Sequence, residues 1–311
     1  MAFISVENLV TRYKTSNGLV YALEDVNFAI EKGESIGIAG ESACGKSTLG
    51  LSIIRMISNG KIYSGEIQFD GKSLLDIPDA DFDKNIRWKE ISMVFQGAMN
   101  SLDPVFSIQQ QFEEVLKQHN FEGDMKEIIL KSLTSVNLDE SILKKFPHEL
   151  SGGMKQRVVI AMALILKPKF IIADEPTTAL DVLIQAQIVN LFKQLKKDGQ
   201  SFMIISHDLA ILSEIVEKIG IMYGGRMVEF GDSTEIFLEP KHPYTKGLLE
   251  SIPMLSKDEK PKYIPGTPPN LVNPEEGCRF YDRCPEAMEK CKKDPPKFTT
   301  KSGYVLCWLY E

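Results

Sequence analysis

Residues 40–48 read GESACGKST, and this stretch decides how the rest of the chain is interpreted. It follows residues 35–39, whose apolar run predicts a strand, and it precedes residues 49–54, whose apolar side chains recur at helical spacing. A glycine, four residues, a second glycine, lysine and serine between a strand and a helix form a phosphate-binding loop. Backbone N–H groups at the start of a helix attract anions because the helix dipole is positive there. We therefore expect this loop to hold a polyphosphate.

Two side chains of the loop add chemistry to its backbone. Lys46 brings a positive charge to the β- and γ-phosphates, and Ser47 brings a hydroxyl ligand for Mg²⁺. A chance glycine loop is the alternative, and the strand and helix on either side argue against it. The residues expected to cradle the phosphates are Gly40, Glu41, Ser42, Ala43, Cys44, Gly45, Lys46, Ser47 and Thr48.

Composition is that of a globular protein. The 311 residues are 43% apolar and 25% charged, and their number exceeds one average domain, so we expect a large domain with an appendage. A net charge of −7 argues against a broad nucleic-acid-binding surface. The longest unbroken apolar run, residues 158–166, is far shorter than the ~20 residues needed to span a bilayer. The first residues lack the pattern of a signal peptide, so we expect a cytoplasmic location.

The N-terminal part of the chain predicts β-structure. We interpret residues 4–10, 20–30 and 35–39 as strands of a small antiparallel sheet that leads into the phosphate loop. Residues 65–72 predict another strand, which ends in an Asp-Gly turn. Tyr13 either stacks on an adenine ring or is an ordinary half-buried tyrosine at a strand end, and the pattern alone favours the second interpretation.

Two further apolar runs end in side chains suited to phosphate chemistry. Gln96 follows the predicted strand 91–95, where its amide could reach a metal ion or an attacking water. Asp174 and Glu175 follow the apolar run 170–173, which is typical of a central parallel strand, and ligands bind at the carboxyl ends of such strands. We expect Asp174 to hold Mg²⁺ and Glu175 to accept a proton from water.

A third strand end carries a histidine. His207 follows the predicted strand 201–205, and this position in the same series favours a γ-phosphate contact over an ordinary loop histidine. Residues 107–145 have apolar side chains at helical spacing and predict an all-helical insertion. A helix over residues 155–166 is predicted to follow. The triplet before it indicates a helix start and leaves anion binding open. Its residues are Ser151, Gly152 and Gly153.

The C-terminal segment differs in composition. Nine of the sixteen prolines lie between residues 253 and 296, which predicts a loop-rich tail with little core of its own. Four of the five cysteines also lie there, spaced C-x5-C-x6-C-x15-C, and in a reducing compartment this clustering indicates a metal site. The gaps do not fit a zinc knuckle, so an iron–sulfur cluster comes before zinc, and unligated thiols are the remaining alternative. These residues are Cys278, Cys284, Cys291 and Cys307.

With these motifs assembled, the chain resembles the ATPase subunits of ABC transporters over residues 1 to about 240. The matching motifs are GESACGKST, the Q-loop Gln96, the signature LSGGM followed by KQR, FIIADEP, the D-loop Ala179-Leu180-Asp181 and the switch histidine His207. The tail sequences HPYTKGLLESIP, IPGTPPNL and GCRFYDRCPEAMEKC resemble the oligopeptide/dipeptide importer branch. Members of that branch carry an iron–sulfur cluster on four such cysteines.

The resemblance implies an α/β fold. Its parts are a RecA-like P-loop core and an antiparallel β subdomain within residues 1–240, a helical subdomain at about 97–165, and the metal-binding tail 241–311. It also implies that Tyr13 stacks on adenine and that Glu175 polarises the attacking water. By the same resemblance, His207 would contact the γ-phosphate, and Ser47, Gln96 and Asp174 would serve Mg²⁺. The resemblance further implies that Ser151, Gly152 and Gly153 act across a dimer interface on the partner's nucleotide. The cofactors implied are ATP, Mg²⁺ and a [4Fe–4S] cluster on the four tail cysteines.

Three residues depart from the family pattern. Met154 replaces the more widespread glutamine of LSGGQ, which is a feature of one of two ATPase types in this branch and implies a heterodimer with a second, related ATPase. Ala43 and Cys44 replace the usual Gly-Ser of the loop. Ala43 fits if its φ is negative. Cys44 lies near Lys46 and a helix N-terminus, so we hypothesise that its pKa is lowered and that its oxidation blocks ATP binding.

The leading interpretation is therefore an ATPase that powers an importer of oligopeptides or dipeptides. It would work with two membrane permease subunits and an external solute-binding protein, without nucleic acid, on the inner face of the cell membrane. A soluble ABC ATPase is the main alternative, although Asp174 follows Lys46 by only 128 positions, too few for the coiled coil of chromosome-type relatives. A regulatory protein without turnover is disfavoured by Glu175 and His207. An importer of a sugar or nickel stays open.

Overall fold

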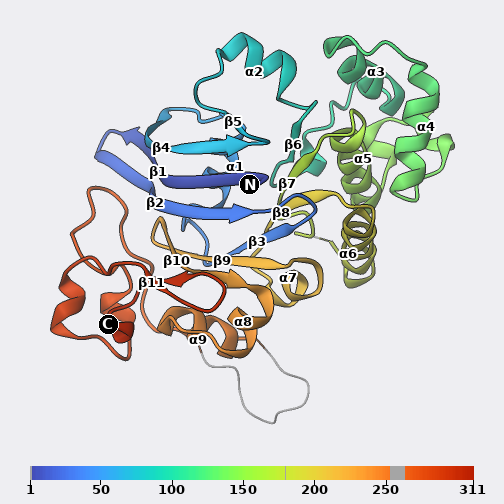
Figure 1. Ribbon diagram of the computed structural model, residues 1–311. Coiled ribbons are helices and arrows are strands. Elements are labelled where there is room, and N and C mark those ends of the chain that lie inside the picture. The colour runs from blue at the N-terminus through green and yellow to red at the C-terminus, as the bar shows by residue number, and fades with distance from the viewer. Residues whose placement is uncertain (1, 179, 253–262) are drawn as a thin grey trace. The chain divides into compact units, whose positions relative to one another are not determined.

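The computed structural model describes residues 2–178, 180–252 and 263–311. Ala179 of the predicted D-loop and the prolines at positions 253 and 261 lie outside the described residues. The chain forms two compact units (Figure 1). The first combines Met1–Asp76 with Ile205–Glu311, and the second is Ile77–Ile204.

An antiparallel sheet forms one part of the first unit. Its strand order is β2-β1-β4-β5. The turn between the last two strands carries Asp70 and Gly71 at φ 49° and 76°, which confirms the predicted Asp-Gly turn. Bulges interrupt the pairing of β1 with both of its neighbours. The bounds are β1 Ile4–Thr15, β2 Gly18–Ile30, β4 Gly60–Phe69 and β5 Lys72–Ser73.

Strands of a second sheet lie in the same unit, in the order β11-β12-β10-β9-β3. The assignment of residues 35–39 to the antiparallel sheet was wrong, because β3 pairs in parallel with β9. All five residues of β3 are buried, as expected for a strand with both faces covered. The bounds are β3 Ser35–Ala39, β9 Lys218–Tyr223, β10 Arg226–Asp232, β11 Phe298–Thr299 and β12 Tyr304–Val305.

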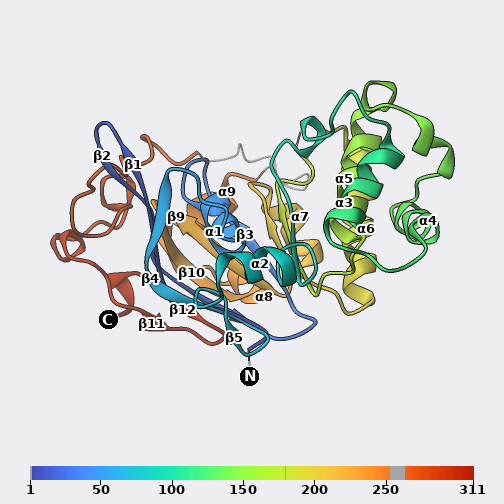
Figure 2. The ribbon, with the colours of Figure 1, turned by 90° about the horizontal axis from the view of Figure 1, so that it is seen from above.

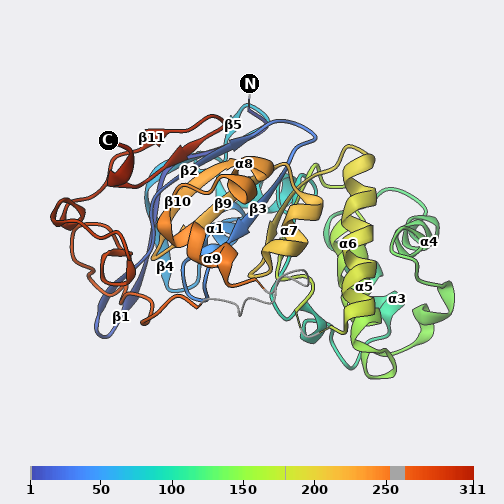
Figure 3. The same ribbon diagram turned by 90° about the horizontal axis from the view of Figure 1, so that it is seen from below.

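Short helices and the tail complete the first unit. Helix α8 packs against β9 and β10 (Figure 3). The tail contains 3₁₀ turns and two-residue strands, as its prolines predict, and it adds β12 to the edge of β10. Phe280 of the tail is buried against Tyr223 and Tyr244, with ring centroids 5.1 and 5.4 Å away. The helices are α1 Lys46–Ile53, α7 Leu209–Ile215, α8 Ser233–Leu238 and α9 Pro243–Glu250, and the tail turns are η4 Tyr281–Arg283, η5 Glu289–Lys292 and η6 Trp308–Tyr310.

The second unit joins parallel strands to a helical region. Its strands follow the order β8-β7-β6, and every residue in them is buried. Helix α6 begins after Asp181, whose carboxylate accepts a hydrogen bond from the N–H of Ile184 at 2.9 Å. The bounds are β6 Ile91–Val94, β7 Phe170–Asp174, β8 Ser201–Ile205 and α6 Val182–Lys197.

The helical insertion packs around α5 (Figure 2). The hydroxyl of Ser132 on α4 donates to the carbonyl of Ala161 on α5 at 2.6 Å. Helix α5 begins three residues before the predicted start at 155, because Ser151 caps it by accepting from the N–H of Met154. Among the described residues, no helix has both the length and the apolar character needed to cross a bilayer. The helices are α2 Asp79–Asn85, α3 Ile108–Gln118, α4 Met125–Ser135 and α5 Gly152–Leu164, with 3₁₀ turns η1 Ala98–Asn100, η2 Glu140–Lys144 and η3 Pro147–Glu149.

Candidate functional site

The loop between β3 and α1 has the backbone that its glycines predict. Gly40 and Gly45 have φ of 150° and 104°, a region that L side chains rarely adopt. A Cβ on Gly40 would lie 2.1 Å from the carbonyl oxygen of Met222, and one on Gly45 would lie 2.3 Å from that of Ala22. Both positions therefore require glycine, since the loop packs directly on the backbone of β2 and β9.

Lys46 lies over this loop at the start of α1. Its side chain is buried, and Nζ donates to the carbonyl oxygens of Gly40 and Glu41, each at 2.8 Å. The ammonium and the first N–H groups of α1 are thus held at the same end of the helix, where the dipole is positive. This arrangement suits an anionic polyphosphate.

Tyr13 lies beside the end of the loop. Its hydroxyl is 3.3 Å from Oγ1 of Thr48, so β1 brings an aromatic ring next to the first turn of α1. The ring is half-buried, as expected for a tyrosine within a strand, and one part of it faces outward. Its stacking on adenine stays a prediction.

The two substituted positions of the loop differ from expectation. Ala43 does not meet the condition of a negative φ, because the loop turns there with φ of 62° and places the residue in the left-handed region, at a cost of about 1–2 kcal/mol. The hypothesis that the pKa of Cys44 is lowered was also wrong. Burial raises the pKa of this thiol by more than the neighbouring Lys46 lowers it. Cys44 is 4% exposed, so its oxidation as a control of ATP binding loses its chemical basis.

His207 belongs to the first unit and lies two residues after the end of β8. The N–H of Ser206 donates to the carbonyl of Ile38 in β3 at 3.0 Å, which places the histidine close to the end of the strand that feeds the phosphate loop. Asp208 caps α7 by accepting from the N–H of Ala210 at 2.9 Å. His207 itself is exposed between these two anchored residues, as a ligand contact requires.

In the second unit, parallel pairing brings Gln96 and Glu175 together. Val94 of β6 is opposite Ala173 of β7, and each of the two polar residues lies two positions beyond this pair. Nε2 of Gln96 donates to Oε2 of Glu175 at 3.0 Å. Asp174 ends β7 and is 3% exposed.

A second donor holds the same carboxylate. Oγ1 of Thr178 donates to Oε2 of Glu175 at 2.9 Å, and Glu175 has a left-handed backbone with φ of 48°. The carboxylate is thus oriented by two neutral donors, and its role as the base stays a prediction. Sequence reasoning missed Thr178, and its place in the turn after Asp174-Glu175-Pro176 was the signal available.

The signature triplet lies at the start of α5. Ser151 and Gly152 are exposed there, and Gly153 is buried. A Cβ on Gly153 would lie 2.6 Å from Cγ2 of Ile184, so this glycine allows α5 and α6 to pack closely within the chain itself. Its contact with a partner's nucleotide stays a prediction.

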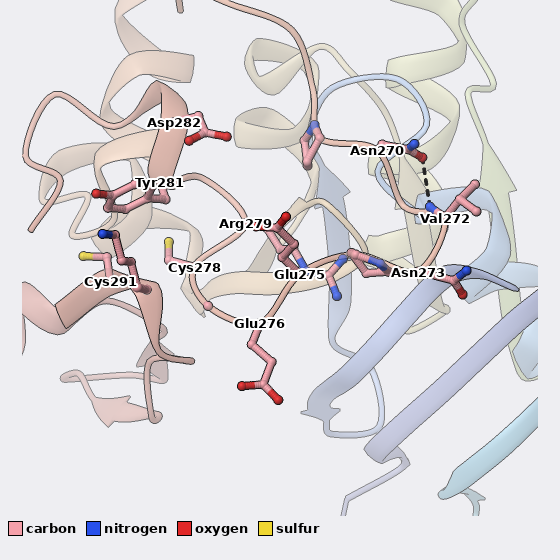
Figure 4. A pocket seen from close by; sticks show the side chains of 14 residues that line it. Asn270, Val272, Asn273, Glu275, Glu276, Cys278, Arg279, Tyr281, Asp282 and Cys291 are labelled. Atoms are coloured by element: carbon pink, nitrogen blue, oxygen red, sulfur yellow. Dashed lines mark hydrogen bonds between the residues drawn. The ribbon is translucent and has the colours of Figure 1, made fainter. Parts of the chain in front are cut away.

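The four tail cysteines converge on one pocket, together with His242. Cys278 and Cys291 also line a larger neighbouring pocket, where Figure 4 shows them near Tyr281. Burial raises the pKa of Cys278 to about 11, with the neighbouring thiols adding to the effect. In the part of the chain that the structure describes, no three His, Cys, Asp or Glu side chains are close enough to hold a single metal ion. The predicted cluster is therefore not confirmed. The pocket residues are Cys278, Cys284, Cys291 and Cys307.

Comparison with known proteins identifies the family. Residues 23–178 match the family described as ABC transporter, and they contain the phosphate loop, Gln96, the signature triplet and Glu175. The chain belongs to the ABC transporter ATP-binding proteins. It is accordingly an ATPase. Residues 228–291 of this ABC protein match a second family, described as oligopeptide/dipeptide transporter, C-terminal region.

Named relatives cover nearly the whole ABC chain. It is 43% identical to the dipeptide transport ATP-binding protein DppD of Caldanaerobacter subterraneus, over 99% of this chain and 97% of that protein. It is 42% identical to the oligopeptide transport ATP-binding protein OppD of Haemophilus influenzae, over 98% and 97%. Among solved structures, the cassette MJ0796 in a dimeric post-hydrolysis state with ADP and Pi has a TM-score of 0.67 and 31% identity, and covers 74% of this chain and 98% of its own.

Proposed function

We propose that this ATPase powers the import of oligopeptides or dipeptides. The observation that supports the substrate class is the tail, since residues 228–291 match the oligopeptide/dipeptide C-terminal region and relatives named for peptide transport cover nearly all of the chain. The first unit contributes a phosphate loop and the second unit a carboxylate held by two donors, and hydrolysis of ATP requires both kinds of group. We place residues 1–240 in the ATPase domain, with a helical subdomain at about 97–165, and residues 241–311 in the peptide-transporter extension.

Each side chain has a role in the proposed reaction. The loop amides and Lys46 bind the β- and γ-phosphates, and Tyr13 stacks on the adenine. Glu175 accepts a proton from the attacking water, and His207 contacts the γ-phosphate. The Mg²⁺ of such sites neutralises charge that develops on the phosphates. Oxygen donors suit this ion, and the chain would hold it through Ser47, Gln96 and Asp174.

Partners follow from the signature triplet. We propose that Ser151, Gly152 and Gly153 contact the nucleotide bound to a second, related ATPase, so that ATP holds the two chains together and its hydrolysis releases them. Met154 in place of the usual glutamine supports a heterodimer. Two permease subunits and an external solute-binding protein would supply the pathway and the specificity. The chain then lies on the cytoplasmic face of the membrane.

We propose further that the tail holds a [4Fe–4S] cluster. Its four thiols line one pocket, and four sulfur donors are the ligand set of such a cluster. The thiols need not approach one common ion, because a cluster distributes them over several irons. Once bound, the cluster would stabilise the fold of a tail that has little core of its own. The ligands are Cys278, Cys284, Cys291 and Cys307.

Reconstitution tests the proposed transport function. The chain is co-purified with its second ATPase and permease subunits, placed in proteoliposomes, and supplied with ATP and the loaded binding protein. We expect ATP-dependent accumulation of a labelled peptide, with nickel and a disaccharide as competing solutes. Uptake of nickel or of the disaccharide without peptide uptake would contradict the proposal.

Iron and sulfide analysis under anaerobic conditions tests the cluster separately. We expect about four irons and four sulfides per chain, lost in each of the variants Cys278→Ser, Cys284→Ser, Cys291→Ser and Cys307→Ser. The Cys44→Ser variant is the matched control and should retain the full content. Zinc, or no metal, in the unmodified chain would contradict the cluster and leave the ATPase assignment unaffected.

A further inference from the structure

Every polar group of Glu41, a residue of the phosphate loop, takes part in a hydrogen bond. Its carbonyl accepts from Nζ of Lys46, and its N–H donates to the hydroxyl of Tyr244, both at 2.8 Å. Its carboxylate receives both ends of the Arg283 guanidinium, at 2.7 Å for Nη1–Oε2 and 2.9 Å for Nη2–Oε1. Tyr244 and Arg283 both belong to the C-terminal extension, so this segment contacts the nucleotide loop directly.

Arg283 uses its whole guanidinium in this contact. Besides the two bonds to Glu41, Nε donates to the carbonyl of Pro265 at 2.8 Å, Nη1 to the hydroxyl of Tyr223 at 3.1 Å and Nη2 to the carbonyl of Ile264 at 3.3 Å. These contacts match the five N–H donors of arginine. The side chain is 6% exposed, against 25% for Glu41, so the pair is screened far less than a surface ion pair.

Aromatic rings hold this pair in place. Tyr223, at the end of β9, packs on Tyr244 with ring centroids 4.5 Å apart, and Phe280 packs on both. The residue before Tyr223 is Met222, whose carbonyl forms the close contact at Gly40. The end of β9, the phosphate loop and the extension therefore pack as one body, all within the first unit.

We infer that Arg283 is a positioning residue of the nucleotide site, which acts through Glu41. Without Arg283, a carboxylate would stand uncompensated beside the place where a polyphosphate binds and would repel it. The loop would also lose an anchor, and binding would then have to order it at a cost in affinity. This inference requires ATP binding at the loop and is independent of both the peptide substrate and the proposed cluster.

The chain offers a matched control. Arg226 of β10 forms a bidentate pair with Asp294 of the tail, at 2.7 and 2.9 Å, the same geometry as in the pair of Arg283 and Glu41. This second pair also connects strand β10 to the tail. Among the contacts of the described residues, none joins this pair to the phosphate loop. Its carboxylate side chain is 51% exposed. Loss of either arginine weakens the tail attachment, and only the loss of Arg283 should weaken nucleotide binding.

Equilibrium binding of a fluorescent ATP analogue with Mg²⁺ to the full-length chain tests the inference. We expect Arg283→Met to raise Kd about tenfold or more and Arg226→Met to leave it within about twofold. Glu41→Gln placed in the Arg283→Met chain should recover most of the lost affinity, because it removes the uncompensated charge. In the assembled transporter, Arg283→Met should raise the KM for ATP and leave kcat at saturating ATP nearly unchanged.

Three results would overturn the inference: an unchanged Kd in folded Arg283→Met, an equal loss in Arg226→Met, or no recovery in the double variant. Should Arg283→Met fail to fold, two milder variants decide the question. Arg283→Lys keeps the positive charge but loses the paired N–H donors of the guanidinium. Tyr244→Phe removes only the hydroxyl that accepts from the backbone N–H of Glu41. Each should raise Kd about threefold, and unchanged affinity in both would also overturn the inference.

Discussion

The loop at residues 40–48 and the turn after β7 both leave buried strands, yet they work through different parts of the chain. In the first, backbone groups carry the proposed phosphate-binding role, and two glycines with φ of 150° and 104° form the turn that presents them. In the second, a side chain carries the proposed catalytic role, and Glu175 is held by Gln96 and Thr178. A site built from backbone is tied to local sequence, whereas one built from side chains depends on which strands lie next to each other.

The largest effect is expected in the turn after β7. Glu175→Gln keeps the shape of the side chain and removes its capacity to take a proton, so turnover should fall by about 10²–10⁴-fold while ATP binding persists. The variant should accumulate as an ATP-bound dimer with its partner. Phosphate release in single-turnover experiments measures this, and rapid turnover would count against Glu175 as the base.

Gly45→Ala probes the backbone site. The new Cβ would lie 2.3 Å from the carbonyl oxygen of Ala22, so we expect a loss of about 2–4 kcal/mol in the free energy of unfolding, together with loss of ATP binding. Gly33→Ala is the control, since Gly33 has φ of 86° with no atom near its Cβ position. It should cost only about 1 kcal/mol. If urea denaturation gives the same loss in the free energy of unfolding for both variants, the backbone angle rather than the close packing determines that loss.

Thr178→Val tests how the carboxylate is oriented. Loss of one hydrogen bond of about 1 kcal/mol should slow turnover about fivefold and leave the Kd for ATP unchanged. Thr178→Ser retains a hydroxyl and should restore the rate. A matching loss of nucleotide affinity would instead place Thr178 in binding.

Ala43→Gly relieves the left-handed backbone of the phosphate loop. The gain in the native state exceeds the added freedom of the unfolded chain, so we expect a net increase in stability of about 0.5–1 kcal/mol. Ala39→Gly, four residues earlier at the end of the buried strand β3, should have the opposite sign. Urea unfolding of both variants measures the difference, and destabilisation by Ala43→Gly would contradict the assigned strain.

The smallest effect concerns Cys44. Because burial raises the pKa of its thiol, the thiolate fraction at pH 8 is lower than for an exposed cysteine and rises only at more alkaline pH. We expect slow alkylation by iodoacetamide at pH 8, and peroxide sensitivity of ATP binding that is unchanged in Cys44→Ser. A clear protection by that substitution would revive the redox hypothesis.

Local pattern predicted most elements closely. Strand β8 occupies residues 201–205, as its apolar run indicated. The helix at 155–166 was predicted to begin too late, because Ser151 caps it and the two glycines form its first turn. The sheet membership of residues 35–39 was mistaken, since an apolar run shows that a strand is buried and does not show which strand lies beside it.

By itself the sequence determined the phosphate loop, because glycine, lysine and serine at fixed spacing are local requirements of a backbone that binds phosphate. It also placed two acids, an amide side chain and a histidine directly after predicted strands. Only the tertiary structure decided that Gln96 and Thr178 share the carboxylate of Glu175, that Ala43 adopts a left-handed backbone, and that Cys44 is buried. The contact of Glu41 with Arg283 joins residues 242 positions apart. Such a contact depends on how distant segments pack, which no local pattern of residues encodes.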